Sequence, residues 1–177
     1  MTRDELAAAI AAAAYLEGDF VLRSGRRSRY YLDKYRFETR PDLLGPIGDA
    51  IARSVAEQAP HATRIAGPEL GAVALAAAAS LAGGLPFLIV RGAAKEYGTA
   101  NRLEGVFEPG EQVCLVEDVV TSGGAAIEAV EGLRAAGLEV RHAVCVVDRE
   151  EGGVDALARA GVRLEPLYRA SELRPAA

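Results

Sequence analysis

Short apolar runs alternate with helix-forming segments along most of the chain. Five runs have the length of buried strands, at 63–66, 87–91, 113–118, 139–147 and 162–167. Helices are predicted between them or before them, at 41–55, 72–82, around 127–130 and at 154–160. Near-continuous apolar strands separated by helices are typical of a parallel sheet that is covered on both faces. The pattern therefore predicts an α/β fold with a central, mostly parallel sheet and helices on both faces.

Helix starts are marked by capping residues. Thr2 and Glu5 have the spacing of a capping box, and the alanine-rich run 6–16 predicts a helix that stops at Gly18. Thr39 is a candidate cap for the second long helix, because a proline follows in the first turn. Both helices have an apolar stripe that can face the sheet.

Two further segments stand outside the alternation of strands and helices. The runs 20–23 and 30–33 predict two strands joined by a Ser-Gly turn, and the basic residues 26–29 follow that turn. The polar, glycine-containing stretch 92–109 lies between two good strands, where parallel neighbours usually need a helix. We expect 92–109 to be a long mobile loop or a β-flap, and a loop of this length in a compact domain is usually functional.

The composition limits the class of protein. A chain of 177 residues that is 50% hydrophobic and 25% charged fits one compact domain, 1–177, with a sizeable core. Its formal charge of -5 argues against broad nucleic-acid binding, so any anionic ligand must meet a local cationic cluster. Cys114 and Cys145 lie in separate apolar runs and are expected to be buried, reduced thiols. With no signal-peptide pattern and no apolar run of about 18 residues, we expect a cytoplasmic protein that does not span a membrane.

The chemistry is concentrated between Val113 and Ala126. An apolar strand ends in Glu117 and Asp118, a turn of small residues follows, and helical spacing resumes behind it. Loop amides and a helix N-terminus can hold a phosphate dianion, and the two acids can accept hydrogen bonds from sugar hydroxyls or meet a hydrated magnesium ion. A P-loop lysine and a GxGxxG pattern are both missing, which argues against a nucleotide triphosphatase and a dinucleotide fold. The plainer alternative is a strand-to-helix turn with two exposed acids near a helix start.

This segment resembles the phosphoribosyl diphosphate (PRPP) signature of phosphoribosyltransferases: two hydrophobics, two acids, two hydrophobics, Thr, a small residue, Gly, Gly and a small residue. Other segments resemble the orotate phosphoribosyltransferase family along nearly the whole chain. The run 20–26 is similar to the family's Phe-Thr-Leu-Lys-Ser-Gly-Arg motif, and an aromatic pair follows it at Tyr30 and Tyr31. The segments 98–105 and 148–150 are similar to the end of the catalytic loop and to the pyrimidine-side motif.

The resemblance implies a phosphoribosyltransferase-type fold with an N-terminal hood at 1–40 and a mobile catalytic loop at 92–109. It also implies magnesium-dependent transfer of the 5-phosphoribosyl group from PRPP to N1 of orotate, giving orotidine 5'-monophosphate and diphosphate, in a homodimer with shared active sites. In this family pattern the catalytic positions are Lys95, Arg91 and Asp118. The positions implied for PRPP are Arg91, Lys95, Tyr97, Glu117, Asp118, Val119, Val120, Thr121, Ser122, Gly123, Gly124 and Ala125. Those implied for orotate are Arg23, Tyr31, Thr121 and Arg149, with magnesium held through PRPP and water near Glu117 and Asp118.

The chain departs from the family pattern at several cationic positions. Gly92 replaces a lysine after Arg91, which predicts weaker diphosphate contact or a lower rate unless Arg102 compensates. Arg23 replaces the lysine of the N-terminal motif, and Tyr97 stands where other members have histidine. The segment Leu70-Gly71 lacks the lysine that some members place in the diphosphate loop.

Three functions remain open from the sequence. The first is the orotate enzyme, the second is a phosphoribosyltransferase for another nucleobase, and the third is a PRPP- or nucleotide-binding regulator with weak catalysis. For Arg149, the alternative to a role at the base is a surface salt bridge with Asp148 or Glu150.

Overall fold

The computed structural model describes residues 1–21, 25, 27–92 and 102–173. Its centre is a six-stranded sheet with the order β5-β4-β3-β6-β7-β8. The strands are β3 (Arg64–Pro68), β4 (Phe87–Val90), β5 (Leu103–Glu104), β6 (Gln112–Val120), β7 (Glu139–Asp148) and β8 (Arg163–Arg169). All neighbouring strands pair in parallel except β4 and β5, which are antiparallel. The predicted mostly parallel sheet is confirmed.

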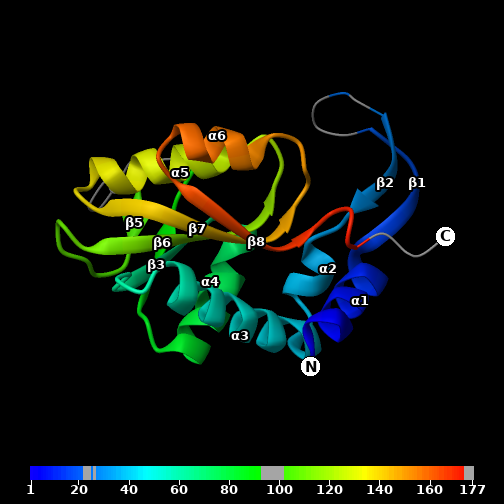
Figure 1. Cartoon of the computed structure of the whole chain (residues 1–177), viewed down its shortest axis with the longest axis horizontal. Helices are drawn as coiled ribbons and strands as arrows, with labels where there is room; N and C mark the ends of the chain where they lie inside the picture. The colour runs from blue at the N-terminus through cyan, green and yellow to red at the C-terminus, as the bar shows by residue number, and fades with distance from the viewer. Residues whose placement is uncertain (22–24, 26, 93–101, 174–177) are drawn as a thin grey trace.

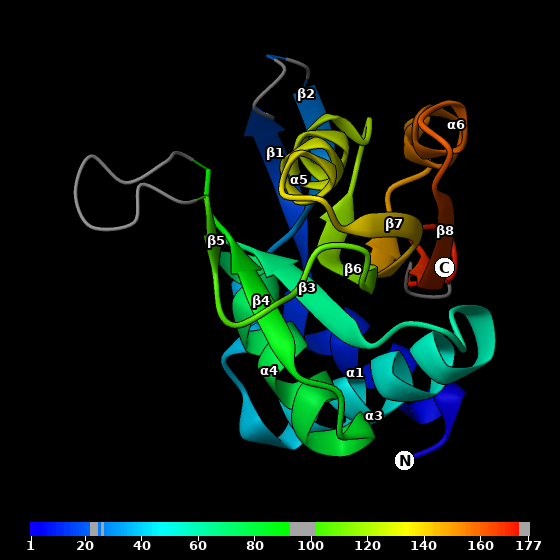
Figure 2. The same ribbon diagram turned by 90° about the vertical axis from the view of Figure 1, so that its left-hand side faces the viewer.

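Helices cover both faces of this sheet (Figures 1 and 2). The helices α3 (Pro41–Gln58) and α4 (Gly71–Gly83) lie on one face, and α5 (Gly124–Ala135) and α6 (Gly153–Arg159) lie on the other. Alternate residues of a strand point to opposite faces. In β6, Cys114 and Val116 join the core under α3 and α4, whereas Val113 and Leu115 join the core under α5. Covering both faces explains why the sequence shows continuous apolar runs.

The N-terminal region packs into the core on the α3 side of the sheet. Helix α1 (Arg3–Ala14) begins with the predicted Thr2 and Glu5 capping box, and it buries Leu6 and Ile10. The strands β1 (Tyr15–Val21) and β2 (Arg27–Leu32) form an antiparallel hairpin that is not part of the central sheet (Figure 1). The sequence-based prediction that the helix runs to residue 16 and stops at Gly18 is wrong. Tyr15 already pairs with Leu32 in the hairpin, which extends the backbone there.

A short helix, α2 (Tyr35–Glu38), was not expected from the sequence and lies between the hairpin and α3. The prediction that Thr39 caps α3 is wrong, because its hydroxyl donates to the Tyr35 carbonyl oxygen at 2.6 Å, at the end of α2. Arg40 precedes α3, with Pro41 at the first position. Phe37 of α2 is fully buried against the core, so packing fixes this short helix where local propensity gave little signal.

Part of the stretch expected to be a loop or flap is described. Strand β5 pairs with β4 through Leu103–Val90 and Glu104–Ile89. Residues 93–101 lie outside the described residues. The expected buried thiols are confirmed: Cys114 and Cys145 are free, and burial raises the pKa of Cys114 to about 12. No helix in the described ranges combines the length and apolarity needed to cross a membrane.

Candidate active site

The turn after β6 leaves backbone amides free for a ligand. Gly123 precedes α5 with a φ of 85°, and no side chain caps this helix. The first amides of α5 therefore lack a side-chain partner, which favours an anion at this N-terminus. A side chain at Gly123 would also meet the backbone of Gly153, at 3.2 Å from its carbonyl oxygen. Glycine is needed here both for the left-handed backbone and for close packing of α6.

The predicted phosphate-loop residues line one cavity of about 560 Å³ at the carboxyl ends of β3 and β6. The cavity is lined by Lys34, Pro68, Glu69, Gly71, Glu117, Asp118, Val119, Val120, Thr121, Ser122, Gly123, Gly124, Ala125 and Ala126. The nine predicted PRPP positions from Glu117 to Ala125 thus line a single concave site together with the start of α5. Arg91 is not among the lining residues, and Lys95 and Tyr97 lie outside the described residues. Clefts at the carboxyl ends of parallel strands are common ligand sites in open α/β sheets.

Glu117 and Asp118 are buried in the wall of this cavity. Burial, with a contribution from the charge of Asp118, raises the pKa of Glu117 to about 8. Its Oε1 atom is buried and makes no hydrogen bond among the described residues. An unmatched buried carboxyl oxygen is costly and is expected to be satisfied by a ligand hydroxyl or by water. The alternative of two exposed acids at a helix start is wrong.

Two charged residues that sequence reasoning missed surround Asp118. Lys34 donates to Asp118 Oδ2 at 2.5 Å, while Asp118 Oδ1 accepts from the Val119 amide at 2.5 Å. Burial alone would lower the pKa of Lys34, but the hydrogen bond and charge of Asp118 outweigh it and raise that pKa. Burial and the charge of Asp118 also raise the pKa of Glu38 to about 7. No local pattern marks Lys34 or Glu38, because the Lys34–Asp118 contact spans 84 residues.

Gly71 completes the surroundings of Asp118. A methyl group built on Gly71 would overlap the Asp118 carboxylate and approach Glu38 Oε1 at 3.1 Å. The start of α4 therefore packs directly against the acid, and only glycine leaves room for it. The sequence places Gly71 in a loop after β3, but its close approach to Asp118 follows from the pairing of β3 with β6.

The predicted diphosphate side is described in part. Arg91 follows β4, and its guanidinium lies 3.7 Å from Glu104. Gly92 donates its amide to Glu69 Oε1 at 2.9 Å, which connects this segment to the cavity wall. Arg102, the proposed compensating cation, binds Glu128 at 2.8 Å and the Gly92 carbonyl oxygen at 3.3 Å. The predicted positions Lys95 and Tyr97 lie outside the described residues.

Arg149 lies where the hairpin meets the central sheet. Its side chain is buried, its amide donates to the Val120 carbonyl oxygen at 2.8 Å, and its guanidinium lies 5.1 Å from the Tyr30 ring centroid. Its guanidinium forms an ion pair with Glu151 at 3.3 Å. The alternative of a salt bridge with Asp148 or Glu150 is therefore wrong. Its Nε atom is buried without a hydrogen bond in the described part of the chain.

The structure brings Tyr30, not Tyr31, to Arg149. Tyr31 points away on the other side of β2, is 42% exposed and packs its ring 5.6 Å from that of Phe20. Tyr30 stacks on Tyr15 with ring centroids 5.2 Å apart. Arg23, the remaining position implied for orotate, lies outside the described residues.

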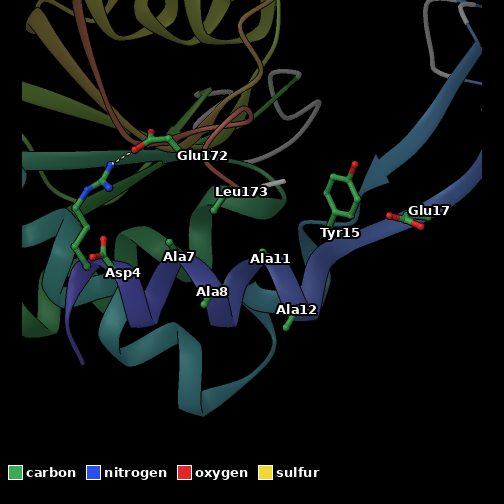
Figure 3. Close-up of a pocket in the computed structure, with 10 residues that line it drawn as sticks. Asp4, Ala7, Ala8, Ala11, Ala12, Tyr15, Glu17, Glu172 and Leu173 are labelled. Carbon is green, nitrogen blue, oxygen red and sulfur yellow. Dashed lines mark hydrogen bonds and ion pairs between the residues drawn. The ribbon is translucent and has the colours of Figure 1, made fainter. Parts of the chain in front are cut away.

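A larger cavity of about 800 Å³ lies beside α1 (Figure 3). Much of its wall consists of alanine methyl groups of α1, and an ion pair between Arg3 and Glu172 lies at one end (Figure 3). It contains none of the residues that the sequence marked for chemistry. The cavity at the end of β6 is therefore the candidate active site.

The sheet order, the acid pair at the end of β6 and the uncapped start of α5 define the class as an α/β protein with a phosphoribosyltransferase-type fold. No protein-family model matches the chain. A protein of Methanocella arvoryzae named orotate phosphoribosyltransferase is 52% identical over 157 residues, covering 88% of this chain and 87% of the relative. A protein of the same name from Halobacterium salinarum is 48% identical over 171 residues, covering 96% and 95%.

Solved structures agree with these relatives. The orotate phosphoribosyltransferase of Mycobacterium tuberculosis in complex with Fe(III) dicitrate superposes with a TM-score of 0.86 at 31% identity, covering 98% of this chain and 99% of that one. The same enzyme in complex with PRPP gives a TM-score of 0.82 at 29% identity, covering 97% and 98%. The chain belongs to the orotate phosphoribosyltransferase family.

Proposed function

We propose that this chain transfers the 5-phosphoribosyl group of PRPP to N1 of orotate, releasing diphosphate and giving orotidine 5'-monophosphate for pyrimidine biosynthesis. The observation that carries the proposal is that one cavity holds both the uncapped N-terminus of α5 and the buried acids Glu117 and Asp118. A phosphate site and a sugar-hydroxyl site would thus lie side by side. Membership of the family supports the same reaction.

The two parts of this cavity suit the two parts of a ribose 5-phosphate. The loop amides and hydroxyls of 121–125 would bind the 5-phosphate, because they combine donors with the positive end of a helix dipole. Glu117 and Asp118 would accept hydrogen bonds from the ribose hydroxyls. Held at both places, the sugar would present C1 to the incoming base, and positioning of this kind lowers the entropic part of the barrier.

Loss of diphosphate from C1 develops oxocarbenium-like positive charge on the sugar and negative charge on the leaving group. Arg91 and Lys95 would stabilise the diphosphate oxygens, since a guanidinium fork and a compact ammonium suit clustered phosphate oxygens. Tyr97 belongs to the same proposed diphosphate segment. Closure of the loop 92–109 would exclude water that could otherwise attack the activated sugar.

The residues present fit a magnesium ion that arrives with its substrate. Among the described residues no group of three or more His, Cys, Asp or Glu side chains could hold a metal ion by itself. Magnesium commonly keeps several waters and is bound through one or two carboxylates and substrate phosphates. The buried, unbonded Oε1 of Glu117 and the neighbouring Asp118 are suitable outer partners for such a hydrated ion. When bound, magnesium would neutralise charge on the diphosphate.

The base would bind between Thr121 and the hairpin. Arg149 is 8% exposed, and its unbonded Nε can donate to a polar edge of orotate. Arg23 and Tyr31 are the other contacts to the base that the resemblance implies, although Tyr30, and not Tyr31, lies beside Arg149 in this structure. The hairpin extends beyond the sheet layers (Figure 2), which suits the proposed role of 1–40 as a hood within a single domain, 1–177. We also propose a homodimer with shared active sites, acting in the cytoplasm.

The test of this function combines purified protein, PRPP and magnesium with orotate, uracil, hypoxanthine or xanthine in separate reactions. Base consumption and diphosphate release are measured together. We expect turnover with orotate alone. Turnover only with another base would contradict the proposal and indicate a phosphoribosyltransferase for that base. Saturable PRPP binding without turnover would identify a regulator. The observation that motivates the regulator is Gly92, which stands where the family pattern has a lysine.

A further inference from the structure

The cavity has an excess of negative charge. Among the described residues that line it, Lys34 is the one cation, whereas Glu69, Glu117 and Asp118 are acids. The proposed substrate is itself strongly anionic. The described wall therefore offers one side-chain ammonium to a ligand that needs several positive partners.

Lys34 occupies a place that a sugar hydroxyl would need. Its Nζ atom lies 2.5 Å from Asp118 Oδ2, while the other carboxylate oxygen accepts from the Val119 amide. A hydroxyl that donates to Asp118 Oδ2 must therefore share that oxygen with the ammonium or displace it. The Lys34 side chain is 32% exposed, against 6% for that of Asp118, so it is the lysine that has room to move. Its flexible stem and rotatable ammonium suit such an exchange.

The position of Lys34 along the cavity decides which ligand group it would meet. The helices α4 and α5 pack on opposite faces of the sheet, so Gly71 and the loop 121–125 line the cavity from opposite sides, which are the Gly71 end and the α5 end. Asp118 Oδ2, which binds Lys34, is also the atom that a methyl group on Gly71 would overlap. Lys34 is thus at the Gly71 end. A sugar whose 5-phosphate binds at α5 would direct its C1 substituent toward this end.

We infer that Lys34 is a binding residue for the diphosphate group of the substrate. In the free protein it is the counter-ion of Asp118, and when ribose hydroxyls bind Asp118 its ammonium turns to an anionic oxygen of the group on C1. The exchange keeps a partner for both charges, since neither the carboxylate nor the ammonium is left unpaired in the cavity. This inference rests on the proposed function, because it takes PRPP as the ligand.

The test compares two ligands that differ only in the group on C1. PRPP and ribose 5-phosphate are titrated by calorimetry into the wild-type protein, Lys34→Met and Lys34→Arg. Loss of a hydrogen bond to a charged group predicts PRPP binding about tenfold or more weaker in Lys34→Met. Ribose 5-phosphate binding should be unchanged or tighter, since its hydroxyls no longer compete with the ammonium. Lys34→Arg should retain most of the PRPP affinity.

Arg36→Met is the matched control, because Arg36 lies two residues away and pairs with Asp33 outside the cavity. It should bind both ligands as the wild type does. Equal weakening of PRPP and ribose 5-phosphate in folded Lys34→Met would overturn the inference and show that Lys34 acts only by holding Asp118. Unchanged PRPP binding would overturn it as well. If thermal unfolding shows that the methionine variant does not fold, Lys34→Gln provides the same comparison.

A parallel assay with orotate separates this inference from the proposed function. A wild-type protein that turns over orotate while Lys34→Met binds PRPP normally would refute the inference alone. If the wild type binds PRPP but turns over none of the bases, selective loss of PRPP binding in Lys34→Met would support the inference about Lys34 and refute the proposed function. A wild type that binds no PRPP would refute both.

Discussion

Replacing Gly71 with alanine is expected to disturb the site from outside the phosphate loop. The added methyl group would overlap the Asp118 carboxylate and lie 3.1 Å from Glu38 Oε1. Asp118 cannot easily retreat, because it is 4% exposed and both carboxylate oxygens are held, one by Lys34 and one by the Val119 amide. The variant must therefore lengthen or break at least one of these bonds.

The size of the effect follows from those contacts. A hydrogen bond to a charged group contributes roughly 1.5–3 kcal/mol, and the better helix propensity of alanine offsets up to about 1 kcal/mol. We expect a net loss of about 2 kcal/mol in the free energy of unfolding. For a chain of this size that lowers the midpoint of thermal unfolding by roughly 4–8 °C. PRPP binding should weaken by about tenfold or more, because displacement of Asp118 costs one well-placed hydrogen bond to the ribose.

Thermal unfolding and calorimetric titration with PRPP measure the two effects. Gly132→Ala is the control, since Gly132 lies inside α5, does not line the cavity, and has no atom within 4 Å of the added methyl group apart from its chain neighbours and the backbone of its own helix. It should leave PRPP binding unchanged and raise stability by up to about 1 kcal/mol. A Gly71→Ala protein with wild-type stability and wild-type PRPP affinity would refute the close packing around Asp118.

Three further predictions concern charge and assembly. Because the pKa of Glu38 is raised from 4.5 to about 7, its contribution to stability is full below the lower value and is lost as pH rises through the upper one. Glu38→Gln should therefore show a smaller loss of stability than the wild type between about pH 5 and pH 8, and identical pH profiles by thermal unfolding would contradict this. Gly92→Lys should raise kcat/KM for PRPP if the missing cation limits the rate, whereas an unchanged value in a folded protein would mean that the missing cation does not limit it. Mixing Lys95→Ala with Asp118→Asn chains should restore part of the activity if the sites are shared, and a mixture no more active than the separate variants would argue against sharing.

The local sequence pattern was sufficient to predict the main strands of the central sheet. Strands such as β6 and β7 are apolar at consecutive positions because both faces are covered, and this made them visible in the sequence. Boundaries set by long-range pairing were not visible. The alanine-rich helix ends before Tyr15 because Tyr15 pairs with Leu32 in the hairpin. The two residues of β5 form a strand because they pair with β4.

In the candidate active site, too, features set by local sequence could be predicted and features set by long-range contacts could not. The phosphate loop could be predicted because its acids, turn and helix are contiguous in the chain. Lys34 and Glu38 could not, since both approach Asp118 from another element and neither belongs to a recognisable local motif. Gly71 lies in a segment that the resemblance marked, but its contact with Asp118 depends on the pairing of β3 with β6. Strand alternation could have separated Tyr30 from Tyr31, but it does not say which face of the hairpin meets Arg149. The tertiary structure shows that the face with Tyr30 meets Arg149.

We propose that Asp118 and the loop behind it serve transfer of a phosphoribosyl group to orotate. The most direct measurement incubates wild-type protein and Asp118→Asn with PRPP, magnesium and orotate, and identifies the nucleotide product by mass. We expect orotidine 5'-monophosphate and diphosphate in equal amounts from the wild type, and formation at least about tenfold slower in the variant. No orotidine 5'-monophosphate from folded wild-type protein, or an equal rate in Asp118→Asn, would contradict it.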